Sequence, residues 1–578
     1  MFRRFLLLGL LFGTLSCANP NIPASFNSTG DIRVSFTDLK IDDQDFGSVT
    51  LTLDPATGKT VGTEVLPEFG TSRSVSWSRA TTRFSFKASD KSLWFDWTLN
   101  ESRLSGVRFA AADNKDQTLL GMLESFSVES AAISGGEIRL IDGAGGTPRD
   151  IDMDLLHQAI SLKGLAAGRI GELAIAETAL TVNLGSGPDP VALAIQIDRS
   201  SLTGLDLAYP ATAISIANDS VSLSLPLYVN ALLDQAESGV GYDSFAYETI
   251  TGAVQVGVQK FSFGLDDYRS GAYRGYVAGP GSMSGIRFAD DTGQKLMIRK
   301  VTASGYDLSS AATGMRDIVD NRPELLEENP EDPFALLAAL PEMDIGKYSI
   351  EGFRLATHIG QGDIRFDSLT FDDLRINREH QLSIGFSLKE LAVWKGYFSG
   401  PENQLILEVL NYAGLDRLVT TIDYHSILDA RTRSLNLDRF DLALDGLISF
   451  ISSVQLSGLQ PADQDGQTPA PLLDSASIDI INDKFLDAIL ASQSVSGKNP
   501  EWHRRDAKRS ISSLRASMTT SSGKAVYDEV IRFLDGAPRL SLSLAPEKPV
   551  PLDQVAGLLT LSADAAVQFL GLKVTAGP

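Results

Sequence analysis

The sequence predicts a mainly β protein, in which a long, curled antiparallel sheet of irregularly repeated hairpins is followed by a helical C-terminal region. Three observations support this prediction. Apolar and polar residues alternate through most of the chain, which is typical of strands that bury one face. A short glycine-containing phrase recurs within this alternating part. Apolar residues take helical spacing in only a few places, most of them after residue 460.

The alternation is clear in RFSFKASDKSLWFDWTL, residues 83–99, where apolar residues occupy every second position on both sides of the polar SDKS. This pattern predicts a β-hairpin with one apolar face. The same pattern returns in AISIANDSVSLSL, GAVQVGVQ, GDIRFDSLTF, SLNLDRFDLAL and PRLSLSLAP. We therefore expect antiparallel strands over most of the chain before residue 460.

The recurring phrase is Gly106-Val107-Arg108-Phe109-Ala110, which returns in related form at residues 204–208, 285–289 and 352–356, with shorter echoes at Gly164 and Gly458. A glycine inside an apolar strand indicates a bulge or a close approach of another strand. The unequal spacing of the copies excludes a solenoid of fixed period. Because too few helices follow to cover every hairpin, we expect an elongated apolar trough lined by Phe109, Leu207, Phe288 and Leu355.

Composition shifts divide the chain further. Residues 1–18 read as a signal peptide and 19–321 as a repetitive β region. The acidic segment 322–343, which contains four prolines, predicts a linker with one or two helical turns. Residues 344–460 read as a second β region with a helical insertion at ENQLILEVLNYAG, where Gly414 stands at the place of a C-terminal cap. Residues 461–578 predict a mostly helical C-terminal region.

The first residues indicate export. Arg3 and Arg4 precede an apolar run, Phe5–Leu15, that is too short to span a bilayer. Cleavage after Ala18 would give a free protein, whereas acylation of Cys17 would give a lipoprotein, and both remain open. We expect a periplasmic or outer-membrane-associated protein whose mature chain has no transmembrane helix.

Several functional classes are disfavoured. The formal charge of −23 repels nucleic acid, and the single cysteine, Cys17, leaves no disulfide. The five histidines lack metal-site spacing, and DQDG at 463–466 lacks the acid that completes a calcium loop. No nucleophile elbow or phosphate loop is found, so neither catalytic residues nor a cofactor is expected. The basic stretch HRRDAKR, residues 503–509, reads as an exposed helix face or as a contact for an acidic partner.

The passage Tyr424–Leu459, YHSILDARTRSLNLDRFDLALDGLISFISSVQLSGL, together with the export signal and the drifting hairpin repeats, resembles the AsmA and YdgA type of repetitive β envelope protein. The resemblance covers about a fifth of the chain and rests on structural motifs. It implies a long curled sheet with an apolar inner face, and a role in envelope maintenance and lipid handling. The chain departs from that group because it lacks a lasting inner-membrane helix.

These observations lead to one functional expectation and one alternative. We expect an exported, non-catalytic envelope protein that binds lipid or other hydrophobic ligands in the trough, with acyl chains as its partners. The alternative is a structural or protein-interaction subunit, such as a scaffold or adhesin, whose partner is another envelope protein. The sequence does not indicate an oligomeric state.

Overall fold

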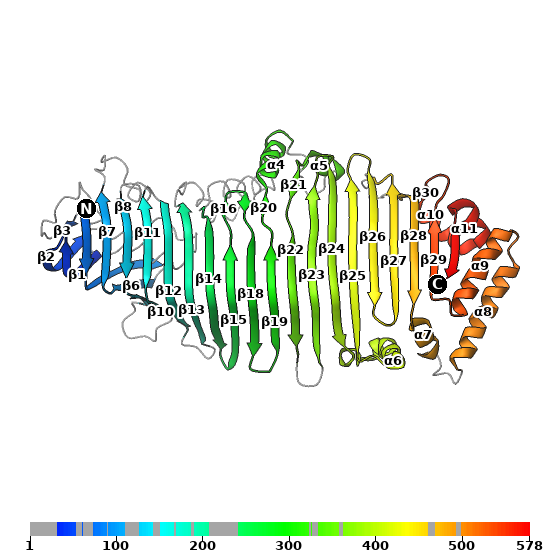
Figure 1. Ribbon diagram of the computed structural model, residues 1–578, viewed down its shortest axis with the longest axis horizontal. Helices are drawn as coiled ribbons and strands as arrows, with labels where there is room; N and C mark the ends of the chain where they lie inside the picture. Colours follow the sequence, from blue (N-terminus) through cyan, green and yellow to red (C-terminus); the bar gives the residue numbers. More distant parts are fainter. Residues whose placement is uncertain are drawn as a thin grey trace. The chain divides into compact units, whose positions relative to one another are not determined.

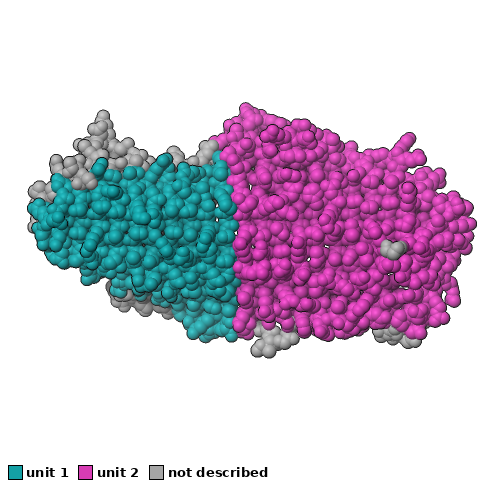
Figure 2. Space-filling model, viewed as in Figure 1, with its two compact units in different colours: residues 1–222, 231–291 teal, residues 223–230, 292–578 magenta. Residues whose placement is uncertain are grey.

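The computed structural model describes residues 32–53, 60–61, 73–88, 91–109, 126–142, 151–166, 169–185, 190–206, 241–322, 325, 333–357, 362–460, 469–492 and 499–577. In these residues the protein is mainly β, its strands pair in antiparallel fashion, and most helices lie toward the C-terminus (Figure 1). The predicted fold class is confirmed. The chain divides into two compact units, residues 1–222 with 231–291 and residues 223–230 with 292–578 (Figure 2). The acidic segment 322–343 belongs to the second unit.

The regular elements described in unit 1 are strands. They are β1 (Ile32–Ile41), β2 (Gln44–Leu53), β3 (Thr60–Val61), β4 (Arg73–Trp77), β5 (Arg79–Ala88), β6 (Lys91–Leu99), β7 (Ser102–Phe109), β8 (Phe126–Ile133), β9 (Gly136–Asp142), β10 (Ile151–His157), β11 (Ile160–Ala166), β12 (Arg169–Leu184), β13 (Val191–Asp206), β14 (Ser244–Val256), β15 (Gln259–Ser270), β16 (Tyr273–Arg274), β17 (Val277–Ala278) and β18 (Gly281–Asp290). The expected hairpin of residues 83–99 is the β5–β6 pair.

The sheet of unit 1 doubles over on itself between β1 and β12. β1 pairs with β5 and β4 in succession along one edge, and β12 pairs with β10 and β11 in the same way. Two branches connect them, β5–β6–β9–β10 and β4–β7–β8–β11. The chain passes between branches at corners, where Asn100 N donates to Gly135 O (2.8 Å) and Ser134 N donates to Glu101 O (2.8 Å).

The core of unit 1 lies between these two branches. Both contribute to one cluster of buried apolar side chains, and Trp97 of β6, Trp77 of β4 and Val107 of β7 are members with 4%, 4% and 0% exposure. The ring of Phe36 meets that of Trp77 edge-on at 5.4 Å. Among the described residues, the doubled sheet thus supplies its own second layer in this part of the chain.

The glycines of the recurring phrase have one common conformation. Gly106, Gly204, Gly285 and Gly352 lie inside strands and have φ between +62° and +66°, which side chains other than glycine rarely adopt. Ladder pairing is interrupted at each of them. The shorter echoes at Gly164 and Gly458 have φ of +67° and +65°. The expectation of equivalent, bulge-like positions within strands is therefore confirmed for the glycines.

Unit 2 continues with strands β19 (Lys295–Ala303), β20 (Tyr306–Asp307), β21 (Met343–Asp344), β22 (Tyr348–Ala356), β23 (Asp363–Ile376), β24 (Gln381–Trp394), β25 (Arg417–Asp429), β26 (Ser434–Leu444), β27 (Ile448–Ser457), β28 (Leu472–Asn482), β29 (Arg539–Leu544), β30 (Val550–Pro551) and β31 (Lys573–Gly577). The main sheet follows chain order, with β19 on β22 and then each strand on the next as far as β29, which pairs with β31.

The helices of the described chain belong to unit 2. They are α4 (Ser309–Asn321), α5 (Pro333–Ala339), α6 (Gln404–Ala413), α7 (Phe485–Ser492), α8 (Pro500–Ala516), α9 (Ser521–Leu534), α10 (Leu552–Leu561) and α11 (Ala563–Leu570), with 3-10 turns at Lys395–Phe398 and Pro401–Asn403. The expected helix at residues 402–414 is α6, and Gly414 ends it in the left-handed conformation, φ +71°. Strands β28 to β31 are interleaved with the C-terminal helices.

Candidate functional site

A row of five aromatic side chains crosses neighbouring strands of unit 2. The register places Tyr348 opposite Phe371, Phe371 opposite Phe386, Phe386 opposite Tyr424 and Tyr424 opposite Phe440. Directly opposed residues of antiparallel strands share a face, so all five lie on one face of the sheet. The ring centroids of Phe371 and Phe386 are 6.1 Å apart, and those of Phe386 and Tyr424 are 5.2 Å apart. We call these five residues the aromatic row.

A second row runs beside the first, two positions further along each strand. Its residues are opposed in succession from β22 to β31. They are Ile350, Leu369, Leu388, Ile422, Leu442, Phe450, Ile480, Leu540 and Ala576. Neither row contains a charged side chain. A continuous apolar strip therefore crosses the sheet at right angles to its strands.

On β22 to β26 both rows are only partly buried. Phe371 is 40% exposed, and the other members on these five strands are half-buried. In the described part of the chain, none of these ten residues belongs to a hydrophobic core cluster. We call these ten residues the open rows.

At the Tyr348 end of the aromatic row, burial and the nearby Tyr306 and Asp344 raise the pKa of Tyr348, so its phenol stays neutral at ordinary pH.

The residues that the sequence nominated for a trough are distributed differently. Phe288 of β18 is 49% exposed, with its ring centroid 6.4 Å from that of Phe263, and it lies in unit 1. Leu355 of β22 is half-buried in unit 2, opposite Leu296 and Ile364. Phe109 is the last residue of β7. Leu207 and the processing candidates Cys17 and Ala18 lie outside the described residues.

The residues that follow the glycines of the recurring phrase lie in different environments. Val107 and Leu205 are 0% and 3% exposed and join the core of unit 1. Ile286, the counterpart of Val107 and Leu205 in the third copy, is half-buried and does not join that core, and neither does Phe288. The doubled part of the sheet ends at β12; Leu205 lies on β13, which pairs directly with β12, whereas β14 and β15 separate β18 from β13.

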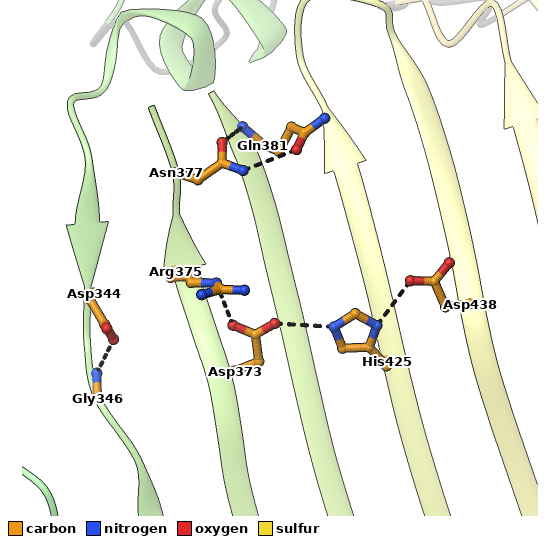
Figure 3. Close-up of polar contacts among 8 residues, drawn as sticks. All are labelled: Asp344, Gly346, Asp373, Arg375, Asn377, Gln381, His425 and Asp438. Carbon is orange, nitrogen blue, oxygen red and sulfur yellow. Dashed lines mark hydrogen bonds and ion pairs between the residues drawn. The ribbon is translucent and has the colours of Figure 1, made fainter. Parts of the chain in front are cut away.

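On the polar face of unit 2, His425 lies between two aspartates (Figure 3). Its Nε2 is 3.1 Å from Asp373 Oδ2 and its Nδ1 is 3.1 Å from Asp438 Oδ2. Arg375 Nε lies 2.9 Å from Asp373 Oδ1. The contact with Asp373 passes over β24 at Gly385, where an added Cβ would come 3.1 Å from Asp373 Cβ and 3.4 Å from His425 Cδ2. Glycine therefore opens the space that this contact needs.

The contacts of this cluster link neighbouring strands of the sheet. Each ring nitrogen of His425 lies within hydrogen-bond distance of one carboxylate oxygen, and each carboxylate belongs to a different strand. The contacts join β23, β25 and β26. Among the described residues, no group of three or more His, Cys, Asp or Glu side chains is arranged to hold a metal ion. We assign the cluster to fastening the sheet.

The basic stretch of residues 503–509 lies in α8. Three cations of this helix turn toward acids of neighbouring segments: Arg504 pairs with Asp487, Lys508 with Asp535, and Arg515 Nε with Asp528 Oδ1 at 2.5 Å. The acidic partners of these three cations come from other segments rather than from α8 itself. These pairs hold α8 against α7 and α9, which leaves Arg505 and Arg509 on its exposed side.

Lowered pKa values occur where carboxylates fasten backbone or neighbouring cations. Hydrogen bonds donated by Thr520 and Thr519 lower the pKa of Asp564 to about 2. The backbone N–H of Ala576 lowers the pKa of Glu529, and Arg539 lowers that of Asp479. These groups belong to separate contacts and do not converge on one cleft. No described helix is both long and apolar enough to cross a membrane.

Comparison with known proteins adds one match. A family model described only as "Uncharacterized protein" matches residues 439–577. This segment begins in β26 and includes the C-terminal helices. No curated protein matches the chain.

Proposed function

We propose that this protein is exported to the bacterial envelope and binds lipid acyl chains along the open rows. The observation that supports the proposal is the apolar strip of β22 to β26, whose ten residues are only partly buried and, in the described part of the chain, join no hydrophobic core cluster. A sheet face of this kind gains stability when it is covered, and where α6 packs on β25 and β26 it meets Leu418 and Leu444 and none of the open-row residues. The strip carries no formal charge, which suits an acyl chain better than a charged peptide.

The contribution of such a contact follows from its area. Burial of apolar surface contributes roughly 25 cal/mol per Å², or about 0.8 kcal/mol for each fully buried methylene. A chain lying on an open face buries only part of its surface, so this value is an upper bound. Affinity should therefore rise with acyl length and depend little on the headgroup.

Mass spectrometry of the protein purified from its own envelope tests the proposal. We expect co-purified lipid, and a mature N-terminus at Asn19 or at an acylated Cys17. Binding of a fluorescent fatty acid should then be compared between Leu369→Asn, which places an amide in the second row, and Thr370→Asn, which places it on the opposite face of the same strand. We expect Leu369→Asn to weaken binding and Thr370→Asn to leave it unchanged.

Two results would contradict the proposal. The first is protein free of lipid that also fails to bind the fluorescent fatty acid. The second is equal loss of binding in both variants, since that would show damage to the strand rather than to its apolar face. Co-purification of another envelope protein in place of lipid would favour the scaffold or adhesin alternative.

A further inference from the structure

The apolar strip changes its surroundings between β26 and β28, although its strand pairing continues. Beyond Phe440 the aromatic row is followed by Ser452, Ile478, Leu542 and Val574. In the second row, Phe450 packs against the cluster that α6 and α7 form with the sheet. Leu540 and Ala576 at the far end are 7% and 5% exposed.

The C-terminal helices bury this far end. Val526, Val530 and Phe533 of α9, Val555 of α10, and Ala566 and Leu570 of α11 pack with the sheet residues Leu540, Leu542 and Val574. Leu570 and Ala566 are 0% and 1% exposed. We call helices α9, α10 and α11 the helical cap. The cap occupies the surface that an acyl chain would need in order to continue along the strip.

Polar contacts fasten the cap at two places. Asp564 at the start of α11 accepts hydrogen bonds from Thr519 N at 2.7 Å and Thr519 Oγ1 at 2.8 Å, and also from Thr520. Glu529 Oε2 of α9 accepts the backbone N–H of Ala576 on β31 at 2.7 Å. The cap is thus fastened at two places, to the turn that precedes α9 and to β31, the last strand of the sheet.

We infer that the helical cap ends the lipid site: an acyl chain occupies the open rows and stops where the cap begins, so unit 2 holds its lipid as a carrier and does not conduct it past β31. This inference rests on the proposed function. It requires lipid to enter and leave across β22 to β26, where the rows are only partly buried, and it limits the length of chain that one site accommodates.

Photo-crosslinking locates the end of the site. The full-length protein is loaded with a fatty acid that carries a diazirine in its chain, irradiated, and digested, and labelled peptides are identified by mass spectrometry. We expect label on β23 to β26 and at least about tenfold weaker label on β29 and β31. Strong label on β29 or β31 of the unaltered protein would overturn the inference and leave the proposed function standing. Label on no strand of unit 2 would overturn both.

Opening the cap gives the complementary test. Asp564→Ala removes the contacts with Thr519 and Thr520, and hydrogen exchange in α11 reports whether the helix has loosened. If α11 stays protected, Leu570→Asp replaces its most buried apolar side chain and serves as the second variant. We expect label to extend to β29 once α11 is open. An open α11 with β29 still unlabelled would show that the helical cap does not end the site.

Discussion

Replacing Gly106 by alanine tests the conformation of the recurring phrase. An added Cβ would lie 2.5 Å from Glu129 Cβ and 3.3 Å from the backbone N of Glu129. A rotamer change moves neither atom, so β7 or β8 has to shift. Gly47 is a matched control, because its φ is also +64° and a Cβ there meets nothing within 4 Å.

Both substitutions place alanine in the left-handed conformation, and only Gly106→Ala also overpacks the space between two strands. The left-handed conformation costs an alanine roughly 1–2 kcal/mol at either site, and the stiffer unfolded chain returns about 0.4–1 kcal/mol at both. Overpacking between β7 and β8 adds about 1–3 kcal/mol at Gly106 alone. We therefore expect Gly106→Ala to lower the free energy of unfolding by about 1–3 kcal/mol more than Gly47→Ala does.

Urea unfolding followed by tryptophan fluorescence measures this difference. Trp77 and Trp97 are buried in the core of unit 1, and a background in which Trp394 and Trp502 are replaced by Phe removes the signal from unit 2. Equal midpoints for the two alanine variants would refute the argument, since the contact with Glu129 would then contribute nothing. Slopes that differ between the variants would have to be resolved first, because they report a change in the unfolding transition itself.

Three further outcomes are expected. Leu570→Ala should destabilise unit 2 by about 2–5 kcal/mol, whereas Phe569→Ala, at a side chain 54% exposed, should stay within about 0.5 kcal/mol; similar urea midpoints would contradict the burial of Leu570. The pKa of Asp564 is about 2 in the folded chain against 3.8 ordinarily, so its stabilising effect is present above pH 4 and is lost as the pH falls toward 2. Asp564→Asn should remove the fall in the urea midpoint that acid causes through Asp564. A variant whose midpoint depends on pH just as that of the unaltered protein does would exclude this role. His425→Ala should lower the free energy of unfolding by no more than about 1 kcal/mol and should speed hydrogen exchange in β23 to β26 but not in β29. Equally faster exchange in all of these strands would argue against a local link between β23, β25 and β26.

Local pattern predicted the elements well. Alternation around SDKS identified the β5–β6 hairpin, helical spacing before Gly414 identified α6, and the phrase identified glycines with positive φ. Each of these features depends on residues that are close in sequence. A period of two assigns a residue to a face, and a glycine in an apolar strand marks a break in that period.

Pairing between distant segments was not predictable in the same way. The period shows that Phe371 and Tyr424 are apolar positions of strands, but not that Phe386 stands between them in register. Likewise, His425 and Asp373 are 52 residues apart, and their contact depends on the lengths of the strands and turns between them. The open rows became visible only when the registers of five strands were known together.

The space above Gly385 links two positions that are far apart in the chain. The imidazole of His425 reaches Asp373 across position 385, where an added Cβ would come 3.1 Å from Asp373 Cβ and 3.4 Å from His425 Cδ2. A larger residue at 385 would therefore crowd this contact, and a smaller or differently directed residue at 425 would relieve the crowding. Among natural variants of this protein, substitutions at these two positions should be inherited jointly. Their joint history would report the strand order of this part of the sheet even where no coordinates are known.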